Sequence, residues 1–191
     1  MADVRVKFAP APMLATRRLL MRGWREADLA PFAAMGADAE VMRYFPFRHD
    51  RAESDRVAQS IQGRFRAWGY GFWAVESVDA PFVGFVGLSR VAFRSDFSGA
   101  IELGWRLGRR YWGKGYATEA ARAALAFAFD RAEAPEVVAF TPEINARSIA
   151  VMERLGMRPD GAFEHPGIAP GPLKRFALYR LERKDFQPQQ G

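Results

Sequence analysis

Hydrophobic and polar residues along this chain follow two periods, which separate its expected helices from its expected strands. Apolar residues at helical spacing, followed by glycines that act as stop signals, predict helices at residues 26–35, 50–68 and 145–155, and a further helix follows the segment 109–120 and ends at about residue 130. Alternating or continuous apolar stretches predict strands at residues 16–22, 72–77, 82–88, 100–107, 137–141 and 176–181. The order is strand, two helices, three strands, helix, strand, helix, strand.

This order predicts one mixed α/β (α+β) domain whose central crossover spans residues 100–141. We expect the domain to cover residues 16–183. Residues 1–15, which contain two prolines, should form an extended lead-in, and residues 184–191 a C-terminal tail. No apolar run is long enough to span a bilayer and no export signal is evident, so we expect no membrane partner.

Composition narrows the chemistry that the domain can perform. The 191 residues include no cysteine and only two histidines, which are far apart in the sequence. Cysteine nucleophiles and cysteine metal sites are therefore excluded, no metal site is expected, and a cytoplasmic location fits. The net charge of +6 suits a polyanionic partner such as nucleic acid, the ribosome or a phosphate-rich cofactor, although charge that only confers solubility explains it equally well.

The segment RRYWGKGYATEA, residues 109–120, joins a predicted strand to a predicted helix. Glycines at 113 and 115 allow positive φ and close approach of a ligand, and the first amides of a helix attract anions. Arg109, Arg110 and Lys114 add positive charge, whereas Glu119 should point away. The Walker loop and the dinucleotide fingerprint both fail to match, so the glycines alone leave open a tight turn without a ligand.

The pattern Arg110-x-x-Gly113-x-Gly115 resembles the acyl-coenzyme A loop of the GNAT superfamily of N-acetyltransferases. The segment ELGWRL at 102–107 resembles the family's central strand, and Asn145-x-x-Ser148 followed by LGM at 155–157 resembles its last helix. Residues 17–20 and 178–181 suit the RimJ/RimL-like branch. The resemblance covers residues 16–181 and implies a mostly antiparallel sheet of six to seven strands, splayed at the centre, with helices on both faces.

The resemblance also implies that acetyl-coenzyme A is the co-substrate and lies in the splayed cleft. Its pantetheine arm would pair with backbone groups of residues 105–107, and its pyrophosphate would sit on amides of residues 110–116. The cofactor-binding residues expected on this basis are Trp105, Arg106, Leu107, Arg110, Tyr111, Trp112, Gly113, Lys114, Gly115, Tyr116, Ala117, Thr118, Asn145 and Ser148.

Acetyl transfer to an amine needs a base, an oxyanion donor and a proton for the departing thiolate. Glu102 is our candidate base, acting through water, unless it is a solvated glutamate or an ion-pair partner of Arg90 or Arg106. Ser148 is our candidate for protonating the sulfur, because Met152 stands where many family members carry a tyrosine. A backbone N–H near residues 105–106 would donate to the oxyanion. For Asn145, capping the helix is a sufficient explanation.

The acceptor is a primary amine, either a protein N-terminus or a small molecule, and the basic surface mildly favours work near the ribosome. Aromatic density suggests pocket walls at Trp24, Phe45, Tyr70 and Trp73, although such density more often marks a core. Two other hypotheses are an acyl-coenzyme A sensor without catalysis and a basic nucleic-acid-binding module. The sequence leaves open whether the protein is a monomer or a homodimer.

Overall fold

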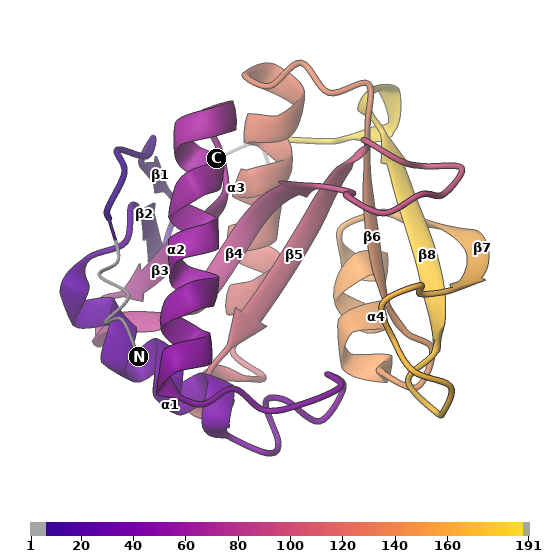
Figure 1. Ribbon diagram of the computed structural model, residues 1–191. Coiled ribbons are helices and arrows are strands. Elements are labelled where there is room, and N and C mark those ends of the chain that lie inside the picture. Colours follow the sequence, from indigo (N-terminus) through magenta and orange to yellow (C-terminus); the bar gives the residue numbers. More distant parts are fainter. Residues whose placement is uncertain (1–6, 189–191) are drawn as a thin grey trace.

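A computed structural model describes residues 7–188 of the chain (Figure 1). In chain order its elements are β1 (Leu14–Ala15), β2 (Leu19–Arg22), η1 (Glu26–Asp28), α1 (Leu29–Ala37), α2 (Arg51–Trp68), β3 (Phe72–Ser77), β4 (Ala80–Arg90), β5 (Ile101–Leu107), η2 (Arg109–Tyr111), α3 (Tyr116–Asp130), β6 (Glu136–Pro142), α4 (Ala146–Arg154), β7 (Arg158–Glu164), β8 (Arg175–Glu182) and η3 (Arg183–Asp185). The predicted mixed α/β class is confirmed. None of these described helices is both long enough and apolar enough to cross a bilayer.

The strands form one sheet in the order β1-β2-β3-β4-β5-β6-β8-β7. Every neighbouring pair is antiparallel except β5 and β6, which run parallel. The sheet has eight strands rather than the six to seven expected. The short strand β1 lies inside the predicted lead-in, and β7 is exposed at nearly every position, so it shows no alternation of apolar residues.

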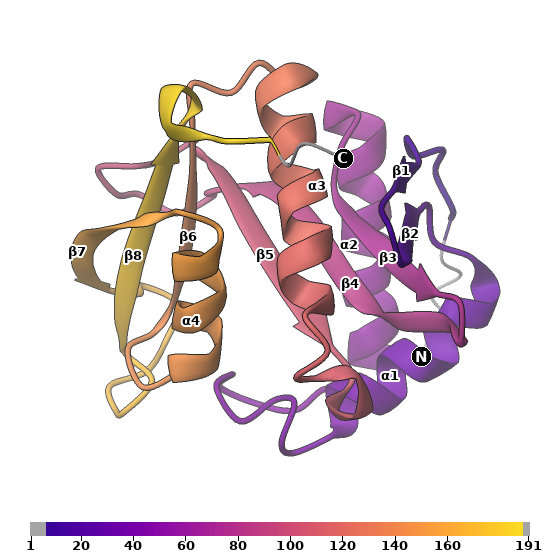
Figure 2. The same cartoon turned by 180° about the vertical axis from the view of Figure 1, so that it is seen from behind.

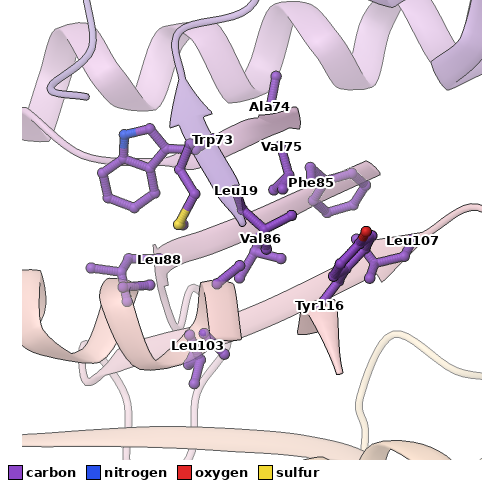
Figure 3. Packing of buried hydrophobic residues seen from close by; sticks show 14 of the residues in the cluster. Leu19, Trp73, Ala74, Val75, Phe85, Val86, Leu88, Leu103, Leu107 and Tyr116 are labelled. Carbon is purple, nitrogen blue, oxygen red and sulfur yellow. The ribbon is translucent and has the colours of Figure 1, made fainter. Parts of the chain in front are cut away.

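Helices cover both faces of the sheet, with α1 and α2 on one face and α3 and α4 on the other (Figures 1 and 2). Side chains from both faces of β2 to β5 and from α1, α2 and α3 belong to one hydrophobic cluster, part of which Figure 3 shows. Ala120, Ala121, Ala124 and Ala128 are fully buried, and these small side chains let the axis of α3 lie close to β4 and β5.

The described part of the expected lead-in is packed against the domain. The backbone N–H of Lys7 donates to Gln59 at 2.8 Å, and that of Ala9 donates to Gln62 at 2.9 Å, so this segment runs along α2. At the other end, the ring of Phe186 lies 5.1 Å from that of Phe129, so the first residues of the expected tail are also part of the packed structure. Residues 1–6 and 189–191 of these segments lie outside the described part of the chain.

Candidate active site

The cleft lies where the two central strands separate. β5 and β6 pair only at Ile101 with Val137 and at Glu102 with Val138, and the rest of the two strands diverge (Figure 1). The remaining length of β5 therefore has one edge without a strand partner. A cavity of about 1350 Å³ opens there, lined by β5, the start of α3, β6, α4 and the segment between α1 and α2. A cavity of this size fits a drug-sized or larger ligand.

The loop before α3 forms a cradle of backbone amides at one end of the cavity. Gly113 has φ 74° and Gly115 has φ 77°, as expected from the sequence, and Gly115 is the N-cap of α3 without a side-chain cap. The first amides of a helix lack partners within the helix, so the start of α3 presents free donors. The indole of Trp112 donates to the carbonyl of Leu107 at 2.8 Å, which ties the loop to the end of β5.

Cations surround this cradle, but not all of those expected from the sequence reach it. The side chains of Arg110 and Lys114 are exposed at the mouth rather than in the lining of the cavity. Two arginines from distant segments also lie against the rings of this loop. Arg147 of α4 stacks over the ring of Trp112 at 4.7 Å, and Arg18 stacks over that of Tyr116 at 4.9 Å.

Glu119 binds the segment before β2 rather than the cradle. Its carboxylate accepts a hydrogen bond from the hydroxyl of Thr16 at 2.7 Å and from the backbone N–H of Arg18 at 2.8 Å, and it forms an ion pair with the guanidinium of Arg18. Glu119 therefore holds the start of the domain against α3 and positions Arg18 beside the cradle.

Glu102 lies on β5 at the last residue before the strands separate, and its side chain lines the cavity. Burial raises the pKa of this carboxyl from 4.5 to about 7, against an opposing effect of the charge on Arg64. The cation beside it thus comes from α2. Arg90, which we had considered as a partner, instead donates to the hydroxyl of Tyr70. A carboxyl with a pKa near 7 is well suited to accept a proton at neutral pH.

Ser148 and Asn145 lie across the cavity from β5, at the start of α4. The amide of Asn145 donates to the hydroxyl of Thr141 at 2.8 Å and to that of Ser148 at 3.1 Å, and its oxygen accepts from the backbone N–H of Ser148 at 3.3 Å. Because Ser148 Oγ accepts from Asn145, its own O–H remains available as a donor to the cavity. Met152, one turn further along, is buried in the same wall.

We expect Asn145→Ala to lower the free energy of unfolding by about 1–2 kcal/mol, because it removes the cap of α4. Asn145→Asp keeps the acceptor for Ser148 N–H and should stay within about 0.5 kcal/mol of the wild type. Urea unfolding followed by circular dichroism measures both variants. Equal losses in the two variants would show that the cap contributes little.

Of the aromatic residues expected to line an acceptor pocket, the structure places only Phe45 in the cavity wall. Trp24, Tyr70 and Trp73 are buried in the core at 3%, 4% and 0% exposure. The indoles of both tryptophans donate to backbone carbonyls, of Phe72 and Pro12 respectively. These three side chains therefore stabilise the fold and do not reach the cleft.

The structure brings most of the expected cofactor residues together. Those that line the cavity are Trp105, Arg106, Leu107, Tyr111, Trp112, Gly113, Gly115, Tyr116, Ala117, Thr118, Asn145 and Ser148. Sequence reasoning missed Arg64 and Arg147, which also line it. Their helical spacing could have indicated which face they occupy, but no local signal indicates which strand or loop that face meets.

Comparison with known proteins agrees with this geometry. A family model described as an acetyltransferase (GNAT) domain matches residues 18–158. The Bacillus subtilis protein YkkB, described as uncharacterised, is 30% identical over 146 residues, which cover 75% of this chain and 84% of that protein.

Solved structures share the fold. A GNAT-family acetyltransferase from Bacillus anthracis superposes with a TM-score of 0.76 at 22% identity, covering 91% of this chain and 99% of that one. A ribosomal-protein-S5-alanine acetyltransferase from Vibrio fischeri superposes with a TM-score of 0.73 at 17% identity, covering 93% of this chain and 100% of that one. At these identities the likeness shows the fold alone, whereas the family model spans most of the chain. The protein belongs to the GNAT family of acetyltransferases.

Proposed function

We propose that the protein transfers an acetyl group from acetyl-coenzyme A to a primary amine, with both substrates bound in the cavity between β5 and β6. The observation that carries this proposal is the position of Glu102. A carboxyl with a pKa of about 7 lies at the point where the strands separate, in the wall of a cavity that the amide cradle closes at one end.

The residues of the cleft fit both the pyrophosphate and the pantetheine arm of coenzyme A. The amides at the start of α3, next to glycines with positive φ, suit the two phosphates, and Arg147 adds charge beside them. The edge of β5 beyond Glu102 has no strand partner, so its backbone groups suit the amides of the pantetheine arm, as in strand addition. The side chains of Arg110 and Lys114 reach only the mouth, where they attract the anion.

Bound acetyl-coenzyme A supplies the activated acetyl group, and the amide C–N bond forms as the thioester C–S bond breaks. Glu102 takes a proton from the acceptor amine, directly or through water. A backbone N–H of β5 near Trp105 donates to the carbonyl oxygen as negative charge develops. The hydroxyl of Ser148, oriented by Asn145, donates toward the sulfur. Met152 has no acidic proton, and the hydroxyl of Ser148 beside it is the candidate donor.

The acceptor amine belongs to a protein N-terminus or to a small molecule, and the absence of cysteine is consistent with work in the cytoplasm. A protein acceptor near the ribosome has support from the net charge of +6 and from the fold shared with a ribosomal-protein acetyltransferase. The scattered cations and the deep cavity favour an enzyme over a nucleic-acid-binding module.

Two measurements test the proposal. Isothermal titration calorimetry should show binding of acetyl-coenzyme A, and a thiol-detecting dye should show release of coenzyme A with members of a panel of peptides and small amines. No heat with acetyl-coenzyme A would refute the proposed function. Tight binding without thiol release across the panel would instead identify a sensor that binds the acyl donor without transfer.

A further inference from the structure

The side chain of Arg106 is a cation without a counter-charge in the cavity wall. Its guanidinium lies 4.0 Å from the ring centroid of Phe45 and 5.3 Å from that of Phe85. The Nε and Nη1 atoms are shielded from solvent and have no hydrogen-bond partner among residues 7–188. Within the same described residues, no carboxylate forms an ion pair with it. Aromatic faces stabilise a cation, but they leave its N–H donors unsatisfied.

Among the described residues, the negative charges nearest this part of the wall act on His49 rather than on Arg106. Burial lowers the pKa of Arg106 to about 10, so the group stays charged at neutral pH. The pKa of the nearby His49 is lowered by burial and then by the charge of Arg106, against smaller opposing effects of Glu53 and Asp50. Glu102 is influenced by Arg64 instead. A charge whose Nε and Nη1 donors are shielded from water and unsatisfied is unfavourable, so an anionic ligand group would be favoured here.

Arg106 and Glu102 belong to the same side of the cleft. Side chains alternate along a strand, so residues 102 and 106 of β5 point to the same face. The contacts agree, because Glu102 lies near Arg64 of α2, and Arg106 lies over Phe45, between α1 and α2. Leu103 and Leu107 point to the opposite face, where α3 packs. The cation is thus on the side of the base rather than in the phosphate cradle.

The spacing sets the size of the ligand that meets both groups. Four residues of strand separate the two Cα atoms by roughly 13 Å. Because both side chains leave the strand on the same face, an amine at the Glu102 carboxyl and an anion at the guanidinium would be on the order of 10 Å apart. Such a ligand is a small amino acid derivative or a short peptide rather than a polyamine.

We infer that Arg106 forms an anion subsite of the acceptor pocket, so that the preferred acceptor carries a carboxylate several ångströms from its reacting amine. The inference rests on the proposed function and goes further, because it names the acceptor class. The two oxygens of a carboxylate can accept two parallel hydrogen bonds from the planar guanidinium of arginine, which binds it more specifically than one contact would. An acceptor without it leaves the buried cation unpaired, which gives selectivity.

The probes are matched pairs of amines that differ only in the anion. 4-Aminobutanoate, 6-aminohexanoate, 8-aminooctanoate and the peptide Ala-Ala-Ala are each compared with their carboxamide counterpart. Coenzyme A release gives kcat/KM for each, and calorimetry on the complex with coenzyme A gives Kd without requiring turnover. For at least one spacing we expect the carboxylate to be favoured about 10- to 100-fold, the value of a hydrogen bond to a charged group.

Three substitutions identify the group responsible. Arg106→Gln should abolish the preference for carboxylate over carboxamide and raise KM for the carboxylate, while Kd for acetyl-coenzyme A stays within about twofold of the wild type. Arg106→Lys keeps the charge and should restore part of the preference. Arg43→Gln, at an exposed arginine over Tyr44 between α1 and α2, is a matched control and should leave the preference intact.

The outcomes separate this inference from the proposed function. Turnover or binding of the probes without any preference for carboxylate, or a preference that persists in Arg106→Gln, overturns the inference and leaves the acetyltransferase proposal standing. The absence of acetyl-coenzyme A binding refutes the proposed function itself. Arg106→Gln loses the contacts with Phe45 and Phe85 as well as an unpaired charge, so its unfolding temperature and circular dichroism are measured beside those of the wild type, and the preference is compared only in folded protein.

Discussion

Replacing Glu102 by glutamine is expected to lower kcat by about 10²- to 10⁴-fold, the usual contribution of a positioned general base. The amide is nearly the same size as the carboxyl and keeps its contacts with the cavity wall, but it cannot accept the proton of the amine. Binding of acetyl-coenzyme A should change little, because the cradle lies at the other end of β5. Steady-state release of coenzyme A, together with calorimetry, measures the two effects separately.

Glu164→Gln is the matched control, because Glu164 is exposed on β7 and does not line the cavity. It should retain the activity of the wild type. If Glu102→Gln turns over as fast as the control, Glu102 is not the base, and an ordered chain of water molecules must take the proton instead.

The pH profile gives a second readout of the same group. Burial raises the pKa of Glu102 to about 7, so kcat/KM of the wild type should fall as the pH drops through 7 and the carboxyl becomes protonated. An acceptor amine adds a limb of its own at higher pH. The limb near pH 7 should therefore stay in place when acceptors of different amine pKa are compared, and it should disappear in Glu102→Gln.

Stability should change in the opposite direction to activity. The pKa of Glu102 is higher in the folded protein than the ordinary 4.5, so between about pH 4.5 and 7 the folded state binds more protons than the unfolded chain. The contribution of Glu102 to the free energy of unfolding is therefore present at low pH and lost as the pH rises through 7. At pH 8 we expect Glu102→Gln to be more stable than the wild type by about 1–3 kcal/mol. Urea unfolding at pH 5 and pH 8 tests this sign.

How much of the fold the sequence predicts depends on whether the signal is local. The alanine face of α3 and the glycines before it are local, and the helix and the positive φ angles agree with the expectation. The signal for strand β7 is not local. Its residues, RPDGAFE, show no alternation and include a proline and a glycine, and they form a strand because β8 offers them a backbone edge.

The candidate site shows the same limit. The alternation along β5 puts Glu102 on the face opposite to Ile101 and Leu103, and the structure places it in the cavity wall. Its cationic neighbour, Arg64, comes from a helix 38 positions earlier in the chain, and only the tertiary packing brings the two together. Aromatic density failed for Trp24, Tyr70 and Trp73 because a core and a pocket wall have the same composition.

The cradle is tested by Gly113→Val, for which we expect acetyl-coenzyme A to bind about 10- to 100-fold more weakly, corresponding to the loss of one or two charge-assisted hydrogen bonds. Gly113 has φ 74° and lines the cavity, with no atom within 4 Å of the position that a Cβ would take. A valine there puts a branched side chain beside the amides that should hold the pyrophosphate, and it strains the loop that presents them. Calorimetry with acetyl-coenzyme A measures the affinity.

Gly99→Val is the control that separates the effect of backbone strain from the loss of the phosphate site. Gly99 has φ 81°, also has open space around its Cβ position, and lies in the loop before β5, outside the cavity lining. Both variants should lose similar stability, because each places a branched residue at positive φ. Only Gly113→Val should lose affinity for the cofactor. Equal affinities in the two variants would show that the start of α3 does not hold the phosphates, and the proposed orientation of acetyl-coenzyme A in the cleft would then be wrong.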